Sequence, residues 1–466
     1  MSYRILTEKM RAQTLQSTLN GRLIHPTDDG YAEACQIYNG MIVRHPALIA
    51  RCADVSDVVA AVNFARESGM PLAIRGGGHS GAGLCMVDDG LVIDLSLMKG
   101  VYVDPAAQMV RVEGGCIWNE VDAATVPFGL AVPSGFISTT GVGGLTLGGG
   151  VGYLTRRNGL TIDNLLAVDV VLADGRLVTA SAHENVDLFW AVRGGGGNFG
   201  VVTSFLFKLS PVETVYGGPM FWSLEDAPTV MKRWRNFILN APEDINGWFG
   251  FHHVPPLPMF PEEHHFKKVC LITWCYTGDP ACAEEVFAPI REWAPPLMDF
   301  VGQIPWTALQ TLFDPLYPPG LQWYWRSDFV KDLDDEAIAL HLKYASELPT
   351  GHSAMHLYPI NGRAQRIDPH DTAWSYRDAN FVQVIVGVDP DPANNARLIE
   401  WAQAYWEALH PHSAGGAYVN MMMQEGDDRV RAAYRYNYER LSMIKAIYDP
   451  DNLFRLNQNI KPYEPC

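Results

Sequence analysis

Runs of glycine constrain this 466-residue chain more than any other feature of its sequence. The first is a turn, Arg75-Gly-Gly-Gly-His-Ser-Gly81, which follows the apolar segment Pro71–Ile74. Glycine lets consecutive backbone N–H groups crowd onto a phosphate, because no Cβ holds the ligand away. A phosphate site does not need His79, whereas an imidazole beside a bound cofactor can coordinate, shuttle a proton or bond covalently. The turn therefore points to a phosphate-bearing cofactor, and a histidine that caps a loop carbonyl is the alternative.

Two further glycine runs lie downstream. In the segment from Ser138 to Tyr153 seven of sixteen residues are glycine, and Arg193–Gly200 leads into an apolar strand predicted over 201–209. The spacing Gly-x-Gly-x-x-Gly occurs at 76–81 and at 195–200, but neither match precedes a helical pattern, as a Rossmann site requires. We therefore expect a nest of backbone N–H groups, rather than a helix end, to hold a pyrophosphate.

Length, composition and charge limit the class of protein and the partners it can have. The length predicts two or three domains, and 48% apolar with 19% charged residues is typical of a globular protein. A formal net charge of -17 without a basic block argues against nucleic acid as a partner. Met1–Lys9 lacks an apolar core and no stretch approaches about 18 apolar residues, so a cytoplasmic protein without a membrane partner is expected.

The eight cysteines include no CxxC pair, so we expect reduced thiols and no metal site. The hydrophobic pattern predicts helices over 54–68 and 116–125, strands over 91–95 and 109–112, and a helical tail over 427–448. Past Pro211 the glycine density falls while Trp, Tyr and Pro increase, which indicates a change of domain.

Four segments together carry a resemblance to a known family. They are Arg75–Ser80; Gly141–Tyr153 with Arg156, Gly159, Asp163 and Asn164 beyond it; Trp190–Gly200; and Tyr448–Pro462. In this order and spacing the chain resembles the berberine bridge enzyme-like group of the vanillyl-alcohol oxidase flavoprotein superfamily over nearly its whole length.

The resemblance implies an α+β fold. Residues 1–211 would form a two-subdomain FAD-binding lobe, 212–414 a substrate domain whose antiparallel sheet roofs the flavin, and 415–466 a segment that returns to the FAD-binding domain. In this family the histidine that matches His79 bonds to the flavin 8α carbon. Bicovalent relatives add a cysteine where this chain has Ile137, so a single covalent bond is expected.

The resemblance also implies the remaining FAD contacts. Backbone N–H groups of the first glycine turn would take the pyrophosphate, the second run would back the flavin, and the tail would reach its edge. The cofactor-binding residues expected are Arg75, Gly76, Gly77, Gly78, His79, Ser80, Gly83, Ser138, Thr139, Gly141, Gly143, Gly144, Gly149, Gly152, Val202, Asn457 and Asn459.

The catalytic base departs from the family pattern. Sugar-oxidising relatives place it in a Tyr-x-Asn-Tyr segment, which here reads Tyr418-Val-Asn-Met421, so the second tyrosine is lost. Either Tyr418 or one of Tyr434, Tyr436 and Tyr438 takes over, or the substrate needs no strong base.

The roof offers further candidates. Tyr324 belongs to an aromatic strand, and Gln383 lies on a strand whose alternation would aim it inward. His356 and Tyr358 are additional possibilities, and a hydrophobic core is the alternative reading of the aromatic residues.

The function expected is an FAD-dependent oxidase that moves a hydride from a C–H bond beside a hydroxyl or amine to flavin N5. The substrate would be a secondary metabolite, alcohol or sugar, and O₂ would give hydrogen peroxide. A dehydrogenase with another acceptor and a catalytically silent flavin-binding protein are the alternatives. The oligomeric state stays open.

Overall fold

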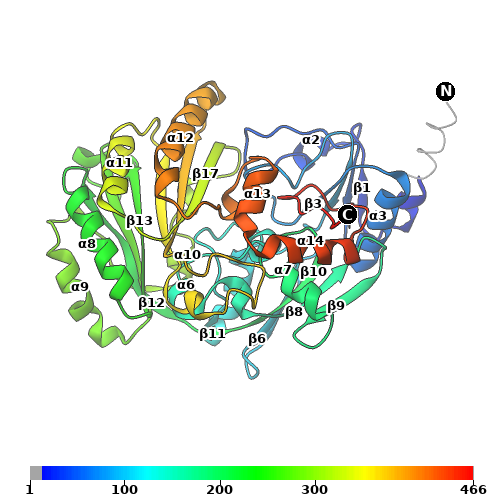
Figure 1. Cartoon of the computed structure of the whole chain (residues 1–466), viewed down its shortest axis with the longest axis horizontal. Coiled ribbons are helices and arrows are strands. Elements are labelled where there is room, and N and C mark those ends of the chain that lie inside the picture. Colours follow the sequence, from blue (N-terminus) through cyan, green and yellow to red (C-terminus); the bar gives the residue numbers. More distant parts are fainter. Residues whose placement is uncertain (1–12, 465–466) are drawn as a thin grey trace.

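The computed structural model describes residues 13–464, in which two bodies lie side by side (Figure 1). One body contains the strands up to β11 and the C-terminal helices. The other is built on a long antiparallel sheet covered by helices on its outer face. The predicted division at residues 211 and 414 stays a proposal, which this partition of the strands supports.

The first body begins with a small sheet in the order β1-β2-β4-β3, in which β2 and β3 run parallel to β4. The helix predicted over 54–68 is confirmed, because the Asp54 carboxylate caps its first turn and Gly69, at φ 70°, ends it. The bounds are β1 Arg22–Ile24, α2 Tyr31–Ala34, β2 Leu48–Arg51, α3 Val55–Ser68, β3 Leu72–Arg75 and β4 Leu91–Asp94.

A second, antiparallel sheet in the order β5-β6-β10-β8-β9 completes this body. Turns follow Gly81 and strand β10 follows Gly200, so in the described chain neither glycine triplet opens a helix. The bounds are β5 Val101–Asp104, β6 Met109–Glu113, α4 Trp118–Thr125, β7 Leu130–Ala131, α5 Val142–Leu147, α6 Thr155–Asn158, β8 Leu165–Val171, β9 Leu177–Ser181, α7 Val186–Val192, β10 Val201–Lys208 and β11 Ser210–Pro211.

The second body is an antiparallel sheet in the order β15-β12-β14-β13-β18-β19-β17, with β16 paired to β12. Helices α8, α11 and α12 lie along its outer face (Figure 1). The bounds are β12 Thr214–Ser223, α8 Ala227–Asn240, β13 Ile245–His253, β14 Lys268–Tyr276, α9 Ala283–Arg291, β15 Met298–Asp299, β16 Gly302–Pro305, α10 Trp306–Gln310, β17 Gln322–Val330, α11 Asp335–Ser346, β18 Ala354–Pro359, β19 Phe381–Asp389 and α12 Asn395–Leu409.

Two residues of the family-like segments join the bodies. The buried Arg156 guanidinium donates to the carbonyls of Ala241 and Pro242, just before β13. The Asp163 carboxylate lies 2.7 Å from the Arg377 guanidinium, and both side chains are buried. These residues therefore support the fold rather than the chemistry.

The C-terminal segment returns to the first body, where α14 packs on α7 (Figure 1). The predicted helical tail is two helices, α13 Asp427–Tyr434 and α14 Asn437–Tyr448, because Arg435 adopts φ 48°. Lys445 is fully buried and donates to the Asp449 carboxylate at 2.6 Å and to the Asn198 carbonyl at 2.6 Å. This lysine therefore ties the tail to the third glycine run.

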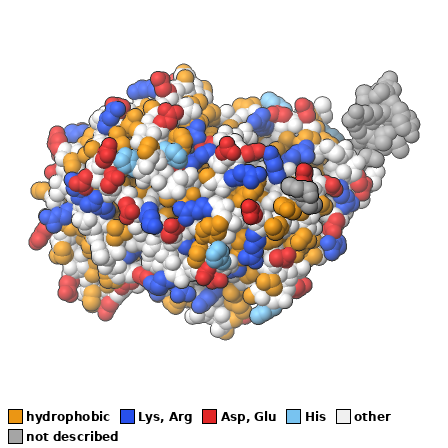
Figure 2. Space-filling model, in the orientation of Figure 1, with side chains coloured by type: hydrophobic (Ala, Val, Ile, Leu, Met, Phe, Trp, Pro, Cys, Tyr) orange, Lys and Arg blue, Asp and Glu red, His pale blue; other side chains and the backbone are white. Residues whose placement is uncertain are grey.

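The surface and the cysteines add little to the functional argument. Acidic and basic side chains are intermixed over the face seen in Figure 2. Within residues 13–464 no helix is long and apolar enough to cross a bilayer, no cluster of metal-ligating side chains occurs, and the seven cysteines are free. Met1–Lys9 lies outside the described residues, and localisation stays a prediction.

Replacing Lys445 with methionine should lower the free energy of unfolding by about 3–5 kcal/mol, because the Asp449 carboxylate would stay buried without its cation. Lys461→Met is the matched control: its ion pair with Asp427 is exposed and screened by solvent, so the loss should be much smaller. Thermal unfolding followed by tryptophan fluorescence compares the two, and equal losses would contradict the anchoring role.

Candidate functional site

A cavity of about 330 Å³ lies where the glycine runs meet the long sheet and the C-terminal tail. Its wall is drawn from both bodies, so neither body forms the site alone. The predicted residues that line it are Gly76, Gly77, Gly78, His79, Ser80, Gly141, Gly143, Gly144, Val202, Asn457, Tyr418 and Tyr434.

His79 lies in this wall, stacked on the Tyr38 ring with centroids 3.6 Å apart. Burial lowers the pKa of its imidazole to about 4, so the ring is neutral at physiological pH. Its Nε2 atom is buried and has no hydrogen-bond partner in the protein. A loop cap would occupy only one ring nitrogen, so the orphaned Nε2 is available to a group bound in the cavity.

Tyr38 and Asn39 connect the histidine turn, residues 75–81, to the roof, which is the long antiparallel sheet of the second body with the loop before β17. The Asn39 amide donates to the carbonyls of Gly81 and Trp323, at 2.6 and 3.0 Å, and its oxygen accepts from the Trp323 N–H. The Tyr38 hydroxyl donates to the Tyr317 carbonyl at 3.1 Å. Sequence reasoning missed both residues, because they stand outside any glycine run or motif.

The glycines of the wall allow backbone to approach backbone. A Cβ on Gly77 would lie 2.5 Å from Gly141 Cα, so the first two runs touch directly. Gly144, within α5, is different: a Cβ there would meet nothing within 4 Å, and its φ suits alanine. Glycine lowers the stability of a helix relative to alanine, and no protein contact requires glycine at this position. A bound group that occupies the space beside Gly144 would explain why glycine stands there.

Tyr418 lines the cavity, as its predicted role requires. Its hydroxyl oxygen accepts from the Gly150 N–H at 3.0 Å and from the Asn420 amide at 2.9 Å. Burial raises the pKa of this phenol to about 12, and the two donors oppose that shift because they favour the phenolate. Met421 also lines the cavity, so the position of the lost tyrosine faces the same space.

Tyr434 reaches the cavity from α13 and meets the third glycine run. Its hydroxyl is buried without a hydrogen-bond partner, and burial raises its pKa. Nearby, the Asn457 amide donates to the Gly197 carbonyl at 3.0 Å, so the tail closes this end of the cavity. Of the other tyrosines considered, Tyr436 is half exposed and bonds the Ser375 carbonyl.

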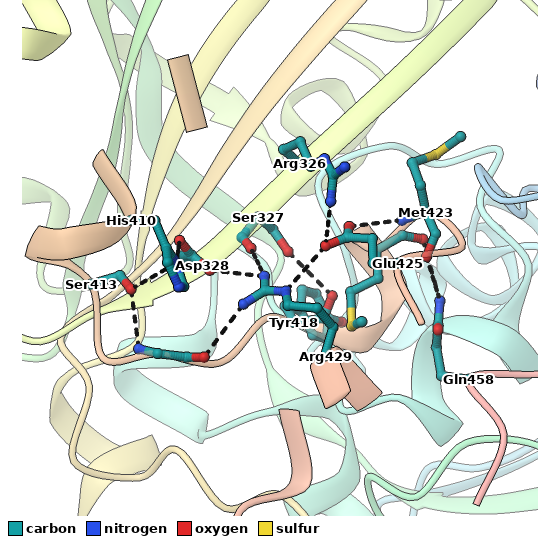
Figure 3. Close-up of polar contacts among 12 residues, drawn as sticks. Arg326, Ser327, Asp328, His410, Ser413, Tyr418, Met423, Glu425, Arg429 and Gln458 are labelled. Atoms are coloured by element: carbon teal, nitrogen blue, oxygen red, sulfur yellow. Dashed lines mark hydrogen bonds and ion pairs between the residues drawn. The ribbon is translucent and has the colours of Figure 1, made fainter. Parts of the chain in front are cut away.

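A buried ion network fixes the segment that carries Tyr418, as Figure 3 shows. The Glu425 carboxylate lies between the guanidinium groups of Arg326 and Arg429, at 2.7 and 3.1 Å. Arg429 reaches on to the Asp328 carboxylate at 2.9 Å, and Asp328 accepts from His410 at 2.8 Å. Carboxylates and cations alternate, so the 418–429 segment is held to β17 with its buried charges paired.

Two predicted catalytic residues lie on the wrong face of the roof. Trp323 and Trp325 of β17 line the cavity, so alternation turns Tyr324 outward, where its hydroxyl accepts from Gln403 of α12 at 2.9 Å. In β19, Val384 and Val386 line the cavity and Gln383 faces away. Both side chains therefore face away from the cavity, which argues against the catalytic roles predicted for them.

Several residues predicted as cofactor contacts do not line the cavity, so their contacts with FAD stay predictions. The Arg75 guanidinium donates to the Ala34 carbonyl at 2.6 Å, and the Ser138 hydroxyl donates to Asp314 at 2.5 Å. The glycines support the wall from behind: a Cβ would collide with Ile42 at Gly83, with Trp374 at Gly149 and with the Ser134 carbonyl at Gly152. Thr139 and Asn459 are likewise absent from the wall; each has a buried oxygen without a partner.

The roof presents a hydrogen-bonded chain that sequence reasoning found only in part. The Tyr358 hydroxyl lies 2.6 Å from His356 Nδ1, and His356 Nε2 lies 2.8 Å from His252 Nε2. All three side chains line the cavity. His356 and Tyr358 were candidates, whereas His252 was missed, because the His252-His253 pair at the end of β13 matches no motif.

Two family models match segments of the chain that line the cavity. An FAD binding domain matches residues 46–181, and a "Berberine and berberine like" model matches residues 417–461. The first match spans the histidine turn and the second glycine run, and the second spans Tyr418 and the tail. The glycine-lined cavity is therefore that of an FAD-linked oxidoreductase, and the chain belongs to the berberine bridge enzyme-like family.

Relatives match almost end to end. The FAD-linked oxidoreductase YgaK of Bacillus subtilis is 32% identical over 454 residues, which cover 96% of this chain and 98% of that protein. The (R)-6-hydroxynicotine oxidase of Paenarthrobacter nicotinovorans is 28% identical over 96% of this chain and 97% of its own length. The crystal structure of 6-hydroxy-D-nicotine oxidase from Arthrobacter nicotinovorans superposes with a TM-score of 0.86 at 25% identity, covering 96% of this chain and 98% of that one.

Replacing Gly144 with alanine tests the fit of the cofactor. The apoprotein should gain about 0.5–1 kcal/mol of stability, because alanine is the better helix former, while FAD content falls, because the new methyl enters the space of the bound group. Absorbance at 450 nm relative to protein measures loading. Gly302→Ala, equally open but on β16, is the control, and full loading of Gly144→Ala would contradict the contact.

Proposed function

We propose that the protein is an FAD-linked oxidase that converts a C–H bond beside a hydroxyl or amine of a small molecule and reduces O₂ to hydrogen peroxide. The observation that carries the proposal is the His79 ring, neutral and with an orphaned buried nitrogen, in the wall of a cavity shared by the FAD-binding domain and the roof. The relative named as a hydroxynicotine oxidase supports an oxidase.

The residues of the cavity fit FAD by chemical type. Consecutive backbone N–H groups of Gly76–Ser80 would hold the pyrophosphate, and His79 would hold the flavin through one covalent bond. Ile137 lines the cavity where bicovalent relatives have cysteine, which supports a single bond. Cys85 also lines it, but burial raises the pKa of its thiol to about 11, so it stays protonated. Bound there, FAD supplies the hydride acceptor and the electrons that reduce O₂.

Tyr418 is the residue best placed to take the substrate proton. As the base it would act in the phenolate form, and the Gly150 N–H and the Asn420 amide both donate to its oxygen, so they stabilise that form before it takes the proton. Loss of the substrate proton to Tyr418 would accompany loss of the hydride from the neighbouring carbon, which leaves a carbonyl or an imine.

The reaction itself is tested by adding sugars, alcohols and aromatic amines anaerobically to the purified protein. Bleaching of the flavin by any of them supports catalysis, whereas a panel that never bleaches it supports a silent flavin-binding protein. Admission of air then separates the acceptors: fast reoxidation with release of peroxide identifies an oxidase, and reoxidation no faster than that of free flavin identifies a dehydrogenase.

His79→Ala should release its FAD when the loaded protein is precipitated with acid, because backbone contacts do not survive unfolding. The wild-type pellet should stay yellow. His183→Ala, an exposed histidine on the loop before α7, is the control and should behave as wild type. Flavin found entirely in the wild-type supernatant would exclude the covalent bond.

Tyr418→Phe should slow anaerobic reduction of the flavin about 100- to 10,000-fold, the usual contribution of a positioned base, without changing FAD content. Stopped-flow absorbance at 450 nm with the substrate found in the panel gives the rate. Tyr324→Phe is the matched control, since its hydroxyl bonds Gln403 on the far side of the sheet. Equal rates for the two variants would assign the base elsewhere.

A further inference from the structure

The cavity wall carries no ionic side chain. Within residues 13–464, the residues that line it include no Asp, Glu, Lys or Arg. Beside the roof, the carboxylates of Glu425 and Asp328 are paired with Arg326 and Arg429, and none of these four residues lines the cavity. A charged substrate would therefore lose its water without gaining a counter-ion, which disfavours its binding.

Aromatic rings line the part of the cavity beneath the roof. Phe136 stacks on Tyr358 with centroids 4.4 Å apart, and Trp248 meets Phe313 at 5.3 Å. Trp323 continues the row, and its indole N–H is buried without a partner. Such a surface favours flat rings, because stacked and edge-on contacts add to the burial of apolar area. The many hydroxyls of an oligosaccharide would find few partners here.

The Tyr358–His356–His252 chain is the main polar feature of this aromatic chamber. The hydroxyl of Tyr358 and the nitrogens of both imidazoles are linked end to end, at 2.6 and 2.8 Å. Burial lowers the pKa of both histidines, so the chain is neutral, with one proton in each hydrogen bond. A neutral chain of this kind donates or accepts at its ends with little penalty, which suits a single hydroxyl.

We propose that the chamber selects an uncharged, flat ring compound that carries a hydroxyl, and that the Tyr358–His356–His252 chain is the element that recognises this hydroxyl. The proposal rests on the proposed function, since it names the substrate class of the same site. Tyr358 and the two histidines act here as specificity residues, whereas Tyr418 keeps the role of the base.

Binding of 2-naphthol to the FAD-loaded protein, followed by calorimetry, tests the proposal without any turnover. The wild type should bind 2-naphthol at least 100-fold more tightly than 2-naphthoate, which has the same rings with a carboxylate, and more tightly than cellobiose. Tyr358→Phe should weaken 2-naphthol binding about 3- to 10-fold, the contribution of one hydrogen bond. His252→Gln, which shortens the chain at its other end, should weaken it as well.

Tyr405→Phe is the matched control, because the Tyr405 hydroxyl also bonds a buried histidine, His341, at 2.7 Å, but between α11 and α12. This variant should bind 2-naphthol as the wild type does. Tighter binding of 2-naphthoate or cellobiose, or equal effects of Tyr358→Phe and Tyr405→Phe, would overturn the proposal. Those results would leave the oxidase assignment intact, because that assignment depends on flavin and reoxidation rather than on this probe.

Discussion

Backbone contact between glycine runs is the constraint on which the site depends. Gly77 and Gly141 approach so closely that a single Cβ would force their loops apart, and Gly81 meets the Trp325 ring of the roof in the same way. Both contacts join segments far apart in the sequence. Side chains at these positions would push His79 away from the roof and open the cavity. The glycines therefore determine where the histidine lies as well as what its neighbours bind.

This packing also determines the electrostatics of the cavity. Because main chain supplies so much of the wall, a diphosphate would be met by N–H dipoles rather than by Lys or Arg. Buried charges lie behind the wall, where Arg429, paired with Glu425, donates to the Ser327 carbonyl and holds the Tyr418 segment to β17. Ions thus serve to position side chains, while the space that receives ligand stays neutral.

Local features of the sequence predicted the first body well and the roof poorly. Asp54 and Gly69 begin and end α3 through local hydrogen bonds and backbone conformation, which can be predicted from the sequence. His79 could be predicted as a site residue because it lies within a run of glycines. The orientations of Tyr324 and Gln383 could not be predicted, because their strands are buried on both faces and no alternation of polar and apolar residues shows which side chains face the cavity. His252 lies on such a strand too, and only the register of the sheet brings it to His356.

The neutral wall gives a physical reason for the covalent flavin bond that we propose. Each N–H contact to a phosphate contributes modestly, and the chain offers no cation in the wall to strengthen them. A cofactor held in this way could dissociate whenever the tail that carries Asn457 moved from the third glycine run. The single bond proposed from His79 would remove that route, so the chamber could stay uncharged for its substrate without losing its cofactor. The absence of ionic side chains and the buried, unprotonated histidine are then two parts of one arrangement.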